Sequence, residues 1–167
     1  MTDVVQKKRW VSVFANREFT QIETQSGYRG GLPDPLGKRI RLTNPATDED
    51  LGDAVLAALA ASRFLHPNEN REFFDIRGRV VPQYEEWVSG VMSEYGYKSR
   101  RAMFKDMKSC DIVELDGVVT MRPTHHEKLE AWSDDGITED RLVRVSTVSP
   151  PLDVGAALRL ALSRCTV

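Results

Sequence analysis

The sequence predicts an α+β fold made of two similar halves (a pseudo-duplication). Its sheet is mainly antiparallel, and helices pack on it. Three observations support this prediction. The stretches DLGDAVLAALA (50–60) and DVGAALRLALS (153–163) align without a gap and share a glycine, Gly52 in one and Gly155 in the other. Each stretch follows three segments with the β-branched, alternating character of strands. Two further helices are predicted between the halves, so the order is three strands and a helix, two helices, then three strands and a helix.

The first half begins with a predicted hairpin. Residues 9–15 and 19–24 alternate like strands, and Asn16–Arg17 between them suits a tight turn. Residues 25–38 contain four glycines and two prolines, so they are predicted to be a loop. A short strand is predicted at 39–43 before the first helix.

Both matched helices are amphipathic with the same spacing. Thr47 is the predicted N-cap of the first helix, whose apolar face consists of Leu51, Ala54, Val55, Ala58, Leu59 and Ser62. The equivalent face of the last helix, predicted at 152–164, consists of Val154, Ala157, Leu158, Ala161, Leu162 and Cys165. Glycine inside a helix costs about 1 kcal/mol relative to alanine, so Gly52 and Gly155 indicate a close approach of each helix to the sheet. Because Ala/Leu-rich composition is common in helices, a chance likeness of two unrelated helices stays open.

The middle of the chain is predicted to be helical. Pro82 suits the first position of a helix that ends at Gly96, and Ser99 suits the N-cap of a shorter helix through Met107. Two strands are predicted after these helices, at 111–115 and 118–122, and an Asp-Gly turn joins them. A third strand is predicted at 141–148 and could be buried on both faces. A polar loop precedes the last strand, and the polar stretch 66–79 receives no assignment.

Length and composition predict one domain, residues 1–167. Hydrophobic residues make up 41% and charged residues 29%, as in ordinary globular proteins, and the net charge of −2 gives no field that attracts nucleic acid or an anionic membrane. No apolar run reaches the ~18 residues of a membrane span, and residues 1–10 lack a secretory signal. Cys110 and Cys165 form no CxxC pair, so we expect a cytoplasmic protein with reduced thiols.

The sequence contains no recognisable catalytic or metal-binding signature. His125–His126–Glu127 is the one histidine cluster, but adjacent histidines point in different directions and no second ligand pair has zinc-site spacing. Both cysteines stand where cysteine serves as a small hydrophobic residue, and no nucleophile or phosphate-binding motif is present. We therefore expect no catalytic residues, no metal, no cofactor and no small-molecule substrate.

The helix predicted across 98–108 is the most basic segment. Arg101, Lys105 and Lys108 would line one side of it and could contact phosphates. A nucleic-acid-binding module that uses this helix is therefore the alternative function. A solvated helix face is the simpler interpretation, because no aromatic residues alternate with the basic ones and the chain is slightly acidic.

Acidic residues form three groups along the chain. Asp48–Asp50 is explained by the helix N-terminus, where the dipole favours negative charge. The other two groups lie in polar connections: Glu69 and Glu72 beside Asp75, and then Asp134, Asp135, Glu139 and Asp140. These six glutamates and aspartates are the candidates for binding a basic partner, although a charged loop can also serve only solubility.

Five blocks together resemble one protein family. They are WVSVF near the start, DEDLGDAVLAALAASRFL, YGYKSRRAMFKDMKSCDI, RPTHHEKLEAWS and DVGAALRLALSRC, which span nearly the whole chain. In this combination the chain resembles the CdiI immunity proteins of bacterial contact-dependent growth inhibition systems. None of the blocks is a catalytic signature, and motifs such as Ser62–Arg63 and Lys98–Ser99 read as determinants of the fold rather than of specificity.

The resemblance implies inhibition by binding. A CdiI protein forms a heterodimer in the cytoplasm with the C-terminal toxin domain of its CdiA effector and blocks the toxin's active site. Such toxins are often nucleases that act on tRNA, and nuclease grooves tend to be basic, so Glu69, Glu72, Asp134, Asp135, Glu139 and Asp140 could contact one as phosphate mimics. The duplicated plan also resembles that of Whirly-type single-strand binders, which is the resemblance behind the nucleic-acid alternative.

Overall fold

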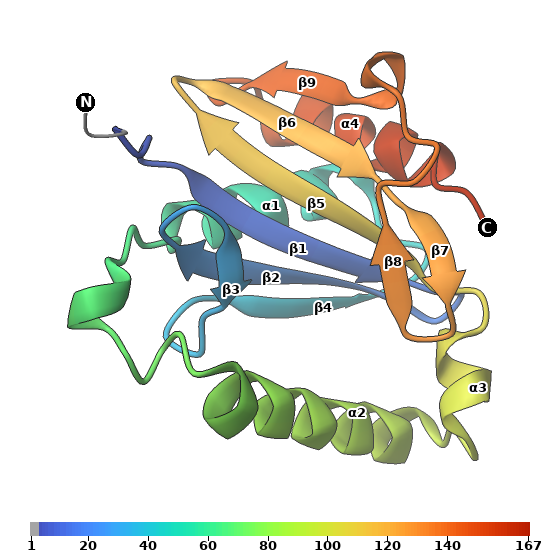
Figure 1. Cartoon of the computed structure of the whole chain (residues 1–167). Helices are drawn as coiled ribbons and strands as arrows, with labels where there is room; N and C mark the ends of the chain where they lie inside the picture. The colour runs from blue at the N-terminus through green and yellow to red at the C-terminus, as the bar shows by residue number, and fades with distance from the viewer. Residues whose placement is uncertain (1–3) are drawn as a thin grey trace.

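A central sheet of seven strands has helices on both faces in the computed structural model, which describes residues 4–167 (Figure 1). The elements in chain order are β1 (Arg9–Ala15), β2 (Phe19–Gly27), β3 (Gly31–Pro33), β4 (Arg39–Thr43), α1 (Asp48–Ala60), α2 (Val81–Tyr95), α3 (Arg100–Phe104), β5 (Lys108–Leu115), β6 (Val118–Pro123), β7 (His125–Lys128), β8 (Ala131–Ser133), β9 (Val143–Ser146) and α4 (Pro151–Ser163). A 3₁₀ turn at Pro67–Glu69 and a π-helical turn at Ile76–Val80 connect α1 to α2.

The strand order confirms the duplicated plan. β1 and β5 pair antiparallel at the centre of the sheet; β2 and then β4 follow beside β1, while β6 and then β9 follow beside β5. Each half is thus a hairpin, a third strand and a helix. Each half also has an insertion between its second and third strands, β3 in the first half and the β7–β8 hairpin in the second.

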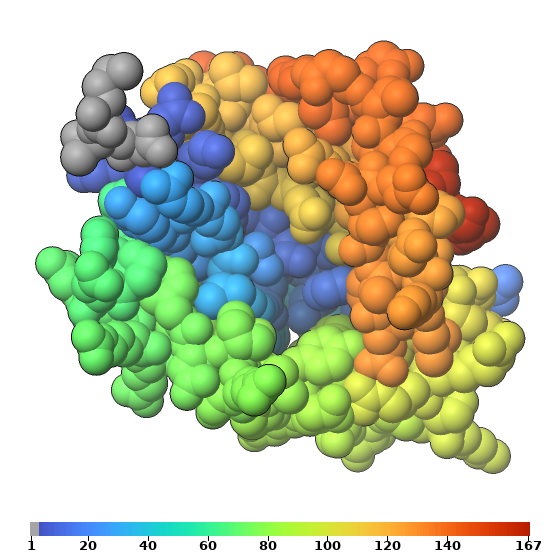
Figure 2. Space-filling view, in the orientation of Figure 1, coloured from blue at the N-terminus to red at the C-terminus, as the bar shows by residue number. Residues whose placement is uncertain are grey.

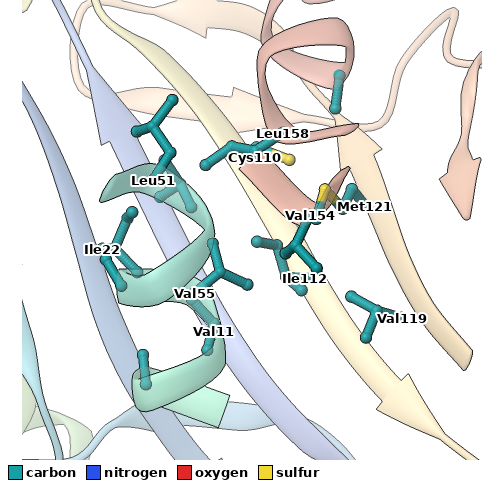
Figure 3. Packing of buried hydrophobic residues seen from close by; sticks show 14 of the residues in the cluster. Val11, Ile22, Leu51, Val55, Cys110, Ile112, Val119, Met121, Val154 and Leu158 are labelled. Carbon is teal, nitrogen blue, oxygen red and sulfur yellow. The ribbon is translucent and has the colours of Figure 1, made fainter. Parts of the chain in front are cut away.

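One face of the sheet is covered by α1 and α4 and contains the main apolar core (Figure 3). Strand alternation turns one set of side chains toward these helices, including Val11, Ile22 and Ile112, each at most 1% exposed. The helices contribute the faces expected from their spacing, and Val55 and Leu158 are fully buried between them and the sheet. The predicted N-cap is also confirmed, since the Thr47 side chain accepts a hydrogen bond from the Asp50 N–H.

The two matched glycines mark a contact between α1 and α4, not between each helix and the sheet. A Cβ added at Gly52 would lie 1.7 Å from the carbonyl oxygen of Pro151, and one added at Gly155 would lie 1.6 Å from that of Asp48. The prediction that glycine permits a close approach is confirmed, but the predicted partner is wrong. The helices cross where any side chain would separate their backbones, and the contact is reciprocal.

The other face of the sheet is partly covered by α2, α3 and the β7–β8 hairpin, which enclose a second cluster rich in aromatic and methionine side chains. Its buried members are Phe19, Trp87, Val88, Val91, Met103, Phe104 and Met107. The predicted cap of α2 is confirmed, because Gly96 has a left-handed conformation with φ of 72°. Ser99 likewise caps α3 by accepting a hydrogen bond from the Ala102 N–H.

Several predicted boundaries are wrong. The loop predicted at 25–38 contains the end of β2 and all of β3, which pair across a tight turn. The polar loop before the last strand contains the β7–β8 hairpin, whose His126 stacks on Trp132 at 5.0 Å. The last strand is limited to β9, an edge strand with alternating exposure rather than one buried on both faces.

The Ser62–Arg63 motif fixes the end of α1 to the sheet, as expected of a fold determinant. The Ser62 hydroxyl donates to the Gln25 carbonyl oxygen at 2.6 Å, and the Arg63 guanidinium donates two hydrogen bonds to the Asp34 carboxylate at 2.8 and 2.9 Å. Burial alone would raise the pKa of Asp34, but hydrogen bonds from Arg63, Ser26 and the Leu36 N–H together hold it below the ordinary value. The ion pair therefore joins the β3–β4 loop to the end of α1.

Candidate functional site

The sheet face turned away from α1 and α4 carries a row of polar side chains. Strand pairing aligns Arg39, Glu23, Ser12, Asp111 and Arg122 across β4, β2, β1, β5 and β6, and we call these five residues the polar row. Arg39 and Glu23 form an ion pair at one end. In Figure 1, α1 and α4 lie behind the sheet and no helix crosses in front of β5 and β6. Asp111 and Arg122 are exposed, so the second half of the polar row is accessible to a partner.

Asp111 is the unpaired acid of the polar row. It is exposed to solvent and makes no ion pair with any residue between 4 and 167. Desolvation by the surrounding protein nevertheless raises the pKa of Asp111, and the neighbouring Arg122 only partly opposes this shift. Figure 2 shows that the surface is hollowed over the central strands of this face.

A groove separates α2 from the strands of the first half. Its inner part is a cavity of about 230 Å³ with Ser12 and Glu23 on the strand side and Val81 and Trp87 on the helix side. Its outer part, of about 570 Å³, is lined by four acidic residues (Glu23, Asp34, Glu86 and Glu94) and two basic ones (Arg39 and Arg41). The groove thus joins an apolar inner cavity to a rim with more acidic than basic side chains.

Aromatic rings form the walls of the inner cavity. The Trp87 ring lies 5.8 Å from Phe14 and 5.8 Å from Tyr84, measured between ring centroids. The Trp87 Nε1–H donates a hydrogen bond of 2.8 Å to Oε1 of Gln21, which fixes the ring against the sheet. The shape of the cavity is therefore fixed by the ring contacts of Trp87 and by its hydrogen bond to Gln21.

A cluster of charged groups fastens the β7–β8 hairpin to α2 and α3. The Tyr84 hydroxyl donates to Glu130 at 2.7 Å, and Arg100 donates to both Glu130 and Glu85. Burial and the hydrogen bond to Glu130 raise the pKa of Tyr84, while the hydrogen bond from Arg100 is the main cause of the lowered pKa of Glu130. The hairpin is held as one wall of the hollow.

The prediction of a basic helix across 98–108 is wrong, because the observed helix is much shorter. α3 ends at Phe104, because the chain turns there and the Met107 N–H bonds to the Phe104 carbonyl, so that Lys108 already begins β5. Arg101, Lys105 and Lys108 therefore do not form one side of a helix. Arg100, the first residue of α3, is engaged in the ion pairs with Glu85 and Glu130.

The six acidic residues predicted to bind a partner are all exposed, but they form two separate groups. Glu69 and Glu72 lie in the connection between α1 and α2, at the left of Figure 1, whereas Asp134, Asp135, Glu139 and Asp140 follow β8 at the upper right. Glu139 pairs with Arg144. Asp140 accepts a hydrogen bond from the Thr138 hydroxyl, the main cause of its lowered pKa. The structure brings four of the six together and leaves the other two apart.

Sequence reasoning did not single out Glu23, Asp111 or the groove. Alternation within 108–115 places Asp111 opposite the core residues Cys110 and Ile112, and this is the signal that could have identified it. Glu23 lies in a strand where polar and apolar residues alternate in the ordinary way, so its position does not stand out. The strand register that aligns Glu23 with Asp111 involves residues 88 positions apart, and no local pattern encodes it.

Metal-binding clusters are absent from the described part of the chain, residues 4–167: nowhere do three histidine, cysteine, aspartate or glutamate side chains gather closely enough to hold an ion. His126 instead bonds through Nε2 to the Leu129 carbonyl oxygen at 2.8 Å. Burial raises the pKa of Cys110 and Cys165, and both are free thiols. Over the same residues, none of the helices has the length and apolar character needed to cross a membrane.

Comparison with known proteins gives consistent matches. The model of the CdiI family, described as CDI immunity protein, matches residues 9–165. Immunity protein CdiI-YPIII of Yersinia pseudotuberculosis serotype O:3 (strain YPIII) is 44% identical over 177 residues, covering 99% of each chain. A chain in the CdiA-CT/CdiI toxin and immunity complex from Yersinia pseudotuberculosis is 42% identical with a TM-score of 0.89, covering 98% of this chain and all of that one. NMB0488 from Neisseria meningitidis, a protein of unknown function, is 38% identical with a TM-score of 0.87 over 99% of each chain. The chain belongs to the CdiI family of CDI immunity proteins.

Proposed function

We propose that this chain is an immunity protein that binds a cognate toxin, the C-terminal domain of a CdiA effector, and neutralises it. One observation carries the proposal: the chain is similar over 98% of its length to a chain of a solved toxin–immunity complex, at 42% identity. Binding alone accounts for such a function, so the protein needs no catalytic activity, cofactor or metal. The encounter takes place in the cytoplasm of the cell that makes the immunity protein.

The proposed mode of inhibition is occlusion of the toxin's active site. If the toxin is a nuclease, its substrate groove is expected to be basic, and acidic side chains can occupy such a groove in place of phosphates. Asp134, Asp135, Glu139 and Asp140 are the larger group of exposed acids, and Glu69 and Glu72 form the smaller one. We propose that at least the larger group contacts the toxin.

Co-expression tests the function itself. The cognate toxin domain should arrest growth when it is expressed alone, and the wild-type chain should restore growth and co-purify with the toxin. Failure of the wild-type chain to bind this domain would contradict the proposal. A nucleic-acid substrate should compete with the immunity protein for the toxin if the active site is occluded, and simultaneous binding of both would rule out occlusion.

Charge reversal tests the acidic residues. The variants are Asp134→Lys, Asp135→Lys, Glu139→Lys and Asp140→Lys combined, and Glu69→Lys with Glu72→Lys. The first set should weaken toxin affinity by about 10-fold or more at low salt and by less at high salt, because salt screens exposed charges. Asp53→Lys with Asp106→Lys is the control, since both residues are exposed acids outside the two groups. Equal affinity of the first set and the control would exclude the acidic residues from the interface.

A further inference from the structure

We infer that the inner cavity of the groove receives one aromatic side chain of the toxin, a tyrosine or a tryptophan, as an anchor of the complex; this rests on the proposed function. The cavity lies between α2 and strands β1 to β3 and opens toward the hollowed face of the sheet. Its volume of about 230 Å³ is below the range of about 300–1,000 Å³ that is usual for small-molecule sites. It has room for one large side chain.

The walls of the cavity favour an aromatic ring. Phe14, Tyr84 and Trp87 surround the space, and Val80 and Val81 close its helix side. Tilted aromatic pairs gain more than their buried area alone provides, and tyrosine and tryptophan dominate the buried centres of protein interfaces. Val81 is 48% exposed at the mouth, so apolar surface is already available to a partner there.

The floor of the cavity is polar and favours a polar tip on that ring. Ser12 is 6% exposed, and its hydroxyl has no hydrogen-bond partner among residues 4–167. Glu23 is 8% exposed; its Oε2 is engaged by Arg39 and Gln21, while its Oε1 has no partner among the same residues. A tyrosine hydroxyl that reaches the floor could donate to Glu23 and accept from Ser12, whereas an indole N–H could donate to one of them.

The charge on the floor selects a neutral tip. Arg39 already neutralises the Glu23 carboxylate, so the site gains little from a second cation. An anion would gain little as well, because the Arg39 guanidinium is already paired with Glu23. A neutral donor on an aromatic ring, as in tyrosine or tryptophan, meets both conditions.

The mouth of the cavity lies at an irregular point of the backbone. The π-helical turn at Ile76–Val80 runs directly into α2, and its last residue lines the cavity together with the first residue of the helix. Such turns are rare and are frequently found at functional sites. Here the turn places two valines beside the aromatic walls.

Two variants test the anchor, with the cognate toxin domain as the probe. Val81→Trp places a bulky ring at the mouth and should weaken binding by about 10-fold or more. Leu160→Trp is the matched control, because Leu160 is similarly exposed at 45% but lies on α4, on the other side of the sheet. It should bind like the wild type. Wild-type affinity in a folded Val81→Trp variant would overturn the inference.

Ser12→Ala supplies a second and milder test. Loss of one hydrogen bond should weaken binding by about 5-fold, and the effect should not depend on salt, unlike that of the acidic variants. The effect should disappear when the tyrosine or tryptophan on the toxin that serves as the anchor is itself changed to alanine. If the wild-type chain does not bind the toxin, the proposed function fails; if it binds and neither Val81→Trp nor Ser12→Ala weakens the complex, only the anchor fails.

Discussion

The two faces of the sheet differ in how they are covered. The face under α1 and α4 is closed by two equivalent helices whose small residues allow backbone contact, and its side chains are almost entirely apolar. The opposite face is covered only in part, by α2, α3 and the β7–β8 hairpin, and it carries the polar row and the groove. The comparison teaches that the duplicated elements build the core, whereas the elements outside the duplication shape the surface open to a partner.

The largest effect is expected on the covered face. Gly52→Ala should lower the free energy of unfolding by about 3 kcal/mol, because the new Cβ overlaps the Pro151 carbonyl oxygen and the helices must separate. Urea unfolding measures this change. Helix propensity alone would give a gain of about 1 kcal/mol, so the sign of the result distinguishes contact from propensity.

Gly90→Ala is the control on the partly covered face. Gly90 lies on α2, and a Cβ there would have no atom within 4 Å. This variant should gain up to about 1 kcal/mol from helix propensity. A loss at Gly90 as large as that at Gly52 would refute the contrast between the two faces.

A smaller effect is expected at the cluster beneath α2. Trp87→Phe keeps most of the ring but removes the hydrogen bond to Gln21, so the free energy of unfolding should fall by about 1–2 kcal/mol. Thermal unfolding followed by circular dichroism measures this loss. Unchanged stability would mean that the bond does not hold α2 on the sheet.

The smallest effect is expected in the polar row and has the opposite sign. Desolvation by the surrounding protein raises the pKa of Asp111, so the folded state disfavours its ionised form and Asp111→Asn should stabilise the protein at neutral pH. The gain should stay below about 1 kcal/mol, because water screens an exposed carboxylate. It should shrink as pH falls through the folded pKa and Asp111 takes up its proton. A loss of stability at neutral pH would show that Asp111 is held by favourable contacts.

The same contrast explains which parts of the structure the sequence predicts. The faces of α1 and α4 follow from helical spacing, and Thr47 and Gly96 follow from capping chemistry, because these signals are local. The partner of Gly52 could not be inferred, since its contact joins residues about 100 positions apart. The β7–β8 hairpin was missed because its His126 and Trp132 pack on each other in a segment that otherwise reads as polar.

The candidate site shows this limit most clearly. Exposed acids such as Asp134 and Asp135 could be selected from composition, but their distance from Glu69 could not. Ser12, Glu23 and Trp87 come from three elements and form one cavity only when the strand register and the position of α2 are fixed. A site assembled by tertiary contacts leaves no motif in the sequence.

The reciprocal contact between α1 and α4 has a consequence for how such a protein changes over generations. A larger residue at Gly52 or Gly155 moves both helices at once, so divergence there needs compensating substitutions in the other half of the chain. The acidic side chains of the segment after β8 are exposed, so substitutions there disturb the packing of the fold less. A lineage that must follow an altering toxin can therefore vary this segment rapidly while the helix pair stays the same.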